Sequence, residues 1–68
     1  MKDYYVNKNA QSNGDHEVHE SGCYWLPMEK NRIPLGKFYT CGGAVSTAKN
    51  HYDQVNGCKH CSEPCHTS

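Results

Sequence analysis

Two short pairs of nitrogen- and sulfur-bearing residues constrain this chain more than any other feature. His19 and Cys23 form the first pair, with three residues between them, and Cys58 and Cys61 form the second, with two residues between them. Each spacing lets two side chains grip one side of a single ion, and zinc takes about four such ligands in tetrahedral geometry. The sequence therefore predicts a Zn²⁺ site made by His19, Cys23, Cys58 and Cys61.

The length of the chain limits how much stability an apolar core can supply. A domain this short buries only about 60% of the surface that its unfolded chain exposes, and ordering costs about 1.5 kcal/mol per residue, so burial alone roughly breaks even. The large apolar residues are few: Val6, Val18, Trp25, Leu26, Ile33, Leu35, Phe38, Val45 and Val55. We therefore expect residues 1–68 to form a single module, with its core at about residues 3–64, that bound zinc stabilises.

Residue patterning and turn signals predict a small α+β fold. A strand is expected over residues 3–7, a turn at residues 13–15, and a second strand over residues 16–19 that completes a hairpin. Alternation predicts another strand over residues 35–40, and helical spacing predicts a helix over about residues 41–52. The expected architecture is a short antiparallel sheet or hairpin packed on one α-helix.

The residues beside the first ligand pair suggest how the site is built. Gly22 can adopt a positive φ without steric cost, which would turn Cys23 back toward His19. Tyr24 and Trp25 follow directly in a loop, and they are expected to cover the metal site.

Other cysteines and histidines compete for the ligand positions. A local cluster of Cys58, Cys61, Cys65 and His66 is the strongest rival, although adjacent residues rarely both reach one tetrahedral ion. His60 lies between the paired cysteines and is expected to point away from the metal. The sequence leaves open whether Cys65 or His66 replaces a preferred ligand.

Two questions remain about the cysteines: the role of Cys41, and whether disulfides replace the metal site. Cys41, at the predicted helix start, is either a small buried residue, which is the favoured interpretation, or a thiol that the helix amino terminus activates. Two disulfides with one spare thiol are the alternative to a metal site, and they require an oxidising compartment. The odd count of five cysteines, with histidine at ligand spacing, favours metal.

Charge and hydropathy limit the classes of partner and location. Seven basic residues balance seven acidic ones and are scattered, so charge does not predict a polyanion partner. No apolar run reaches the length of a signal peptide or a membrane span, so we expect a cytoplasmic monomer without membrane contact. An unidentified protein is the preferred partner. Nucleic acid is a weaker hypothesis, based on the residues Tyr24, Trp25, Lys30, Arg32 and Lys37.

The sequence contains no recognisable catalytic constellation. Glu17 and Glu20 flank His19, but they do not form the helical His-Glu-x-x-His motif of a metalloprotease. The preferred function is a structural zinc module that acts by binding a partner rather than by catalysis. The alternative is a thiol-based enzyme or alkyl-acceptor protein that uses Cys41 or Cys65 outside the metal shell.

Four motifs occur in a characteristic order. They are His19-x-x-x-Cys23, the run Asn-Arg-Ile-Pro-Leu-Gly-Lys-Phe over residues 31–38, Ala44 in the short helix, and Gly-Cys-Lys-His-Cys over residues 57–61. In this order they resemble the metal-binding domain of the Ada DNA-repair proteins, over roughly residues 16–64. They are also similar to Ada-like zinc modules appended to bacterial nucleases and to small stand-alone bacterial proteins of uncharacterised function.

The resemblance implies a compact α+β zinc module of bacterial type. Ada proteins use four cysteines, and their first ligand is the methyl acceptor, whereas this chain has His19 at that place. Sacrificial alkyl transfer by that route is therefore not expected. The segment between the ligand pairs is also longer than in the family, so the family's DNA-contacting surface is not carried over to this chain.

Overall fold

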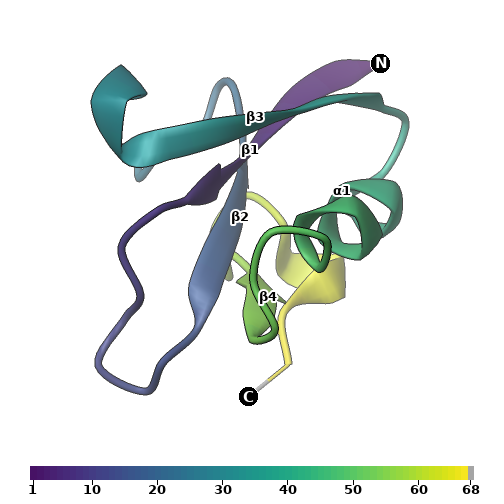
Figure 1. The fold of residues 1–68 in the computed structure, drawn as a ribbon. Coiled ribbons are helices and arrows are strands. Elements are labelled where there is room, and N and C mark those ends of the chain that lie inside the picture. Colours follow the sequence, from purple (N-terminus) through teal and green to yellow (C-terminus); the bar gives the residue numbers. More distant parts are fainter. Residues whose placement is uncertain (68) are drawn as a thin grey trace.

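A computed structural model describes residues 1–67 as a four-stranded mixed sheet with one α-helix packed against it (Figure 1). The strands lie in the order β3-β1-β2-β4 across the sheet. Their bounds, with those of the helix and two short 3-10 turns, are β1 Lys2–Asn7, β2 His16–Glu20, η1 Glu29–Asn31, β3 Arg32–Phe38, α1 Cys41–Ala48, β4 Val55–Gly57 and η2 Glu63–Cys65. Within residues 1–67, no helix is long and apolar enough to cross a membrane.

The sheet confirms the predicted α+β fold and adds one strand to it. β1 pairs antiparallel with both β2 and β3, as expected of a hairpin extended by a third strand. β4 pairs parallel with β2, and the sequence did not indicate this strand, because a segment of three residues is too short for a periodic signal. The sheet is therefore mixed rather than purely antiparallel.

The third strand and the helix differ in their bounds from the prediction of a strand over residues 35–40 and a helix over about residues 41–52. The third strand begins at Arg32 rather than at residue 35 and ends at Phe38, because it pairs with β1 along its whole length. The helix ends at Ala48 rather than near residue 52, and the backbone N–H of His51 closes a further turn onto the carbonyl oxygen of Ala48. A helix rich in glycine and β-branched residues has low intrinsic propensity, so docking against the sheet limits its length.

The core lies between the sheet and α1. Alternate side chains of three strands meet small residues of the helix, and the buried cluster consists of Tyr4, Val6, Val18, Leu35, Cys41, Ala44 and Ala48. Gly43 keeps this contact close, because a Cβ atom there would lie 2.7 Å from Cδ1 of Phe38. Trp25, counted among the large apolar residues, lies outside this core.

A disulfide between Cys41 and Cys65 joins the start of α1 to η2. The prediction that Cys41 is buried is correct, but the prediction that it is unbonded is wrong. The yellow C-terminal segment in Figure 1 accordingly lies beside α1. The structure therefore combines one disulfide with three free cysteines, an arrangement that neither sequence-based alternative described.

The predicted turn at residues 13–15 is present, and Gly14 adopts a φ of 94° there. The expectation for Gly22 is wrong, because positive φ values among the described glycines occur at Gly14 and Gly36 instead. The chain after β2 turns through a hydrogen bond from the backbone N–H of Cys23 to the carbonyl oxygen of Glu20, at 3.0 Å. This turn brings Cys23 back toward β2 without a left-handed glycine.

Candidate metal centre

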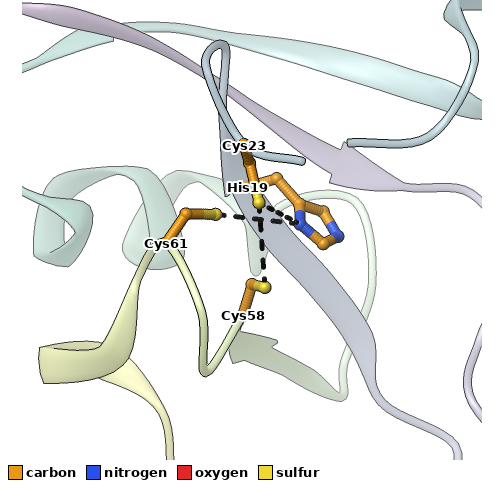
Figure 2. Close-up of side chains that lie close together, drawn as sticks. All are labelled: His19, Cys23, Cys58 and Cys61. Carbon is orange, nitrogen blue, oxygen red and sulfur yellow. Dashed lines mark hydrogen bonds between the residues drawn. The ribbon is translucent and has the colours of Figure 1, made fainter. Parts of the chain in front are cut away.

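Four side chains converge at the end of β2 (Figure 2). They are those of His19, Cys23, Cys58 and Cys61, and their potential ligand atoms all lie within 4.8 Å of one another. His19 and Cys58 are buried, while Cys23 and Cys61 are partly buried. The four residues predicted from spacing are thus brought together, and they could hold a metal ion.

The parallel pairing of β2 with β4 creates this convergence. Val18 lies opposite Gly57 in the register, so the residues that follow them, His19 within β2 and Cys58 just after β4, occupy neighbouring positions. The backbone N–H of Cys58 donates to the carbonyl oxygen of Val18 at 2.9 Å and fixes this relation. The chain then turns back through a hydrogen bond from the N–H of Ser62 to the carbonyl oxygen of Cys58, at 2.7 Å.

The distances within the cluster fit a tetrahedral site. With Zn–S and Zn–N bonds of about 2.3 and 2.0 Å, tetrahedral geometry separates neighbouring ligand atoms by about 3.6–3.8 Å. Nδ1 of His19 lies 3.6 Å from Sγ of Cys23 and 3.9 Å from Sγ of Cys61. The Sγ atoms of Cys23 and Cys58 are 4.0 Å apart. Contraction by up to about 1 Å would bring the four atoms to tetrahedral contact with one ion.

Burial sets the protonation of the cluster in the absence of a cation. It lowers the pKa of His19 to about 4, so the imidazole is neutral at physiological pH and one ring nitrogen has a free lone pair. It raises the pKa of Cys61 to about 12 and also raises the pKa of Cys23. A bound divalent cation reverses this preference for the thiol form, because a coordinating thiol loses its proton. The cluster is therefore suited to a cation and poorly suited to free thiolates.

The rival ligand set is wrong. Cys65 is bonded to Cys41, and Nδ1 of His66 lies 2.9 Å from the carbonyl oxygen of Gly57. His60 is exposed and its ring lies 4.5 Å from that of Trp25, which agrees with the prediction that it points away from the metal. Neither Cys65 nor His66 joins the four-residue cluster.

Two aromatic residues of the loop after Cys23 do not cover the site as predicted. Tyr24 is 90% exposed and Trp25 is 51% exposed. Trp25 lies between Tyr24 and His60, with ring centroids 4.6 and 4.5 Å away. We call Tyr24, Trp25 and His60 the aromatic surface, which presents its rings to solvent beside both ligand pairs.

Two of the basic residues considered for nucleic-acid binding are engaged within the molecule. Arg32 donates from Nη1 to the carbonyl oxygen of Pro27 at 2.9 Å, and its guanidinium lies 4.6 Å from the ring centre of Tyr5. Lys37 pairs with Asp3 at 2.9 Å. Both charges are therefore already engaged in contacts within the fold.

Comparison of the chain with protein-family models, with curated proteins and with solved structures finds no match. The residues of the site themselves indicate which ion it could bind. Three thiols and one imidazole complete a closed set of four ligands. Residues 1–67 form no pocket beside these ligands.

Proposed function

We propose that this protein is a structural zinc module that acts by binding another protein. The observation that carries the proposal is the convergence of His19, Cys23, Cys58 and Cys61 within 4.8 Å. Soft thiolates with imidazole in a four-ligand set suit Zn²⁺, whereas harder ions such as Mg²⁺ and Ca²⁺ prefer oxygen. In this proposal the ion joins the end of β2 to the segment after β4 and supplies folding free energy that the thin core lacks.

The aromatic surface is the part of the molecule best placed to bind the partner. Tyr24 and Trp25 directly follow the ligand Cys23, and His60 directly precedes the ligand Cys61. An ion that holds both ligand pairs would also fix these rings relative to one another. Exposed tyrosine and tryptophan supply large contact area at protein interfaces.

A protein partner fits the charges better than a nucleic acid. The chain has equal numbers of acidic and basic residues, and three thiolates on one divalent ion add about one negative charge. Nucleic-acid affinity comes mainly from neutralising phosphates with free lysine and arginine side chains. Arg32 and Lys37 are already paired within the fold. We further propose that the module is a monomer until it meets its partner.

Native mass spectrometry with and without a chelator tests the zinc centre. We expect one zinc ion per chain at neutral pH and a marked fall in Tm when the ion is removed. A well-folded chain that is isolated without metal and does not take up zinc would contradict the proposal.

The partner surface is tested separately with the triple variant Tyr24→Ala, Trp25→Ala, His60→Ala. These side chains are exposed, so the variant should keep its zinc and its fold. In quantitative affinity purification, proteins that bind the zinc-loaded wild type should fail to bind the variant. The same proteins should also fail to bind the chelated wild type. Retention of every binding protein by the variant would place the interface elsewhere.

A second candidate function, a thiol enzyme or alkyl acceptor, depends on the two cysteines outside the cluster, Cys41 and Cys65. Both sulfurs are in the disulfide, so neither is a free nucleophile in this structure. Rapid alkylation of either residue at neutral pH with zinc in place would favour this function. The resemblance to Ada metal-binding domains stays a proposal and supports only the zinc centre.

A cytoplasmic location also stays a prediction. The Cys41–Cys65 disulfide weighs against a strongly reducing compartment, since disulfides persist mainly in oxidising environments. Measuring the redox state of the two cysteines in source cells would decide between the compartments.

A further inference from the structure

The imidazole of His19 has two nitrogens in different surroundings. Nδ1 faces the thiols, with Sγ of Cys23 at 3.6 Å and Sγ of Cys61 at 3.9 Å. Nε2 lies on the opposite edge of the ring and, within residues 1–67, has no hydrogen-bond partner, although the side chain is only 1% exposed. A buried polar atom without a partner is rare in native structures and calls for an explanation.

One carboxylate lies close enough to Nε2 of His19 to accept a hydrogen bond from it after a small shift. Oε1 of Glu17 is 3.7 Å from Nε2 of His19, and the Glu17 side chain is only 14% exposed. Alternation along β2 places residues 17 and 19 on the same face of the strand. The backbone of Glu17 is held by its parallel pairing with Asn56 of β4, next to the residues that deliver Cys58.

We propose that Glu17 is a positioning residue that accepts the Nε2–H of His19 and thereby fixes Nδ1 as the metal-binding nitrogen. This inference rests on the proposed zinc centre. A neutral imidazole has one N–H, so coordination through Nδ1 requires the proton on Nε2. A shift of about 1 Å would bring Glu17 and His19 within the N–H···O distance of about 2.7–2.9 Å typical of carboxylate acceptors.

This arrangement explains two features at once. It gives the otherwise unpartnered Nε2 atom an acceptor, and it gives a nearly buried carboxylate a donor. Carboxylates in this position orient a histidine ligand and increase its basicity toward the ion. Glu20, the next glutamate of the strand, instead pairs with Lys2 at 3.2 Å and so offers a matched control.

The experiment compares Glu17→Ala, Glu17→Gln and the control Glu20→Gln with wild type. Zinc affinity is measured by competition with a chromogenic chelator. We expect Glu17→Ala to bind zinc about 10–100-fold more weakly. Glu17→Gln, which keeps an acceptor oxygen, should lie within a few-fold of wild type, and Glu20→Gln should be unchanged.

Long-range proton–nitrogen NMR of the zinc-loaded protein reports the protonation of each His19 nitrogen. This signal would not change if Glu17 only stabilised the fold. In wild type we expect His19 to be coordinated through Nδ1 and protonated on Nε2, with a slowly exchanging Hε2 proton. That proton should exchange faster in Glu17→Ala and slowly again in Glu17→Gln.

The possible outcomes separate the two proposals. Coordination through Nε2, or a Glu17→Ala variant that matches wild type in affinity and exchange, would overturn the role of Glu17 while leaving the zinc centre intact. If Glu17→Ala does not fold, the nitrogen assignment in wild type decides the question. A wild-type chain that binds no zinc would overturn both.

Discussion

The backbone N–H of Cys58 donates a hydrogen bond of 2.9 Å to the carbonyl oxygen of Val18, and this contact holds the two halves of the candidate metal centre together. It continues the parallel pairing of β4 with β2 by one residue. Cys58 is a member of the four-residue cluster, and Val18 directly precedes another member, His19. The geometry of the site is therefore built into the sheet, and the ion completes an arrangement that the backbone has already begun.

Replacement of Cys58 by serine should abolish stoichiometric zinc binding. Cys58 is a buried member of the cluster, and serine is a much weaker zinc ligand. Apparent zinc-binding free energies in such sites are on the order of 10 kcal/mol, and we expect a loss of several kcal/mol. Chelator competition measures the loss. The double variant Cys41→Ser, Cys65→Ser also removes two sulfurs but should still bind one ion, and loss of zinc from that control would show that the cluster is not the site.

The same double variant should be less stable than wild type. The disulfide joins residues 24 positions apart, and a closed loop of this size stabilises a fold by about 3 kcal/mol. Chemical denaturation of the zinc-loaded proteins measures the difference in unfolding free energy. Alkylation of the denatured wild-type chain should label three cysteines before reduction and all five after it. Five labels without reductant would contradict the disulfide.

Gly57→Ala should be destabilising because no room exists for a side chain. A Cβ atom there would lie 2.7 Å from the carbonyl oxygen of Ser62 and 2.8 Å from Cβ of Cys65. Relief of these clashes requires movement of the backbone that carries Cys58 and Cys61, at a cost of about 1–3 kcal/mol. Thermal melts of the zinc-loaded protein should show a lower Tm.

Gly22→Ala is the matched control for this substitution. Its Cβ would meet only Oε1 of Glu20, at 3.9 Å, and Gly22 does not need a positive φ. We expect a change within about 0.5 kcal/mol. Equal effects of the two substitutions would mean that the packing around Gly57 is looser than in this structure.

Zinc affinity should fall steeply as the pH is lowered. Burial raises the pKa of Cys23 and raises that of Cys61 to about 12, so the metal-free site holds protons on both thiols at pH 7, and zinc must displace them. His19, with its pKa lowered to about 4, has no proton to release there. Displacement of at least these two protons makes the apparent affinity fall by about 100-fold or more for each pH unit between pH 8 and 6. Calorimetry in buffers of different ionisation enthalpy counts the protons, and release of none would contradict the raised pKa values.

The stability of the metal-free protein should fall both at acidic and at alkaline pH. The lowered pKa of His19 makes the unfolded chain bind the extra proton first, so stability falls as the pH drops below about 6.5. The raised pKa of Cys61 makes the unfolded chain lose its proton first, so stability falls as the pH rises above about 8.5. Melting of the chelated protein from pH 5 to 10 should therefore give a maximum between these values. A monotonic curve would contradict the burial of these two groups.

The candidate site could be predicted from sequence to the extent that its chemistry is local. The spacing within each ligand pair is short, so His19 with Cys23 and Cys58 with Cys61 were recognisable without any knowledge of the fold. Their convergence depends on β4, a strand of three residues that leaves no periodic signal. The two pairs could be assigned to one site only because four ligands are needed.

Other features depend on tertiary contacts that composition does not encode. The partner of Cys41 could not be deduced, since the connectivity of cysteines does not follow from their number. Trp25 is apolar enough to suggest a buried position, yet its loop lies at the edge of the site and leaves it half exposed. The sequence shows Glu17 only as a neighbour of His19, and its approach to Nε2 follows from the orientation of the ring.

The disulfide has a consequence for how the chain would respond to proteolysis. The covalent ring between Cys41 and Cys65 contains the exposed residue Lys59, which lies between two members of the cluster. A tryptic cut after Lys59 would separate Cys58 from Cys61 in sequence, yet the released tail would stay attached to α1 through its sulfur bridge. A nicked molecule would therefore remain one covalent species, heavier than the intact chain by one water, until a reductant is added, and both fragments would still be present to share one ion.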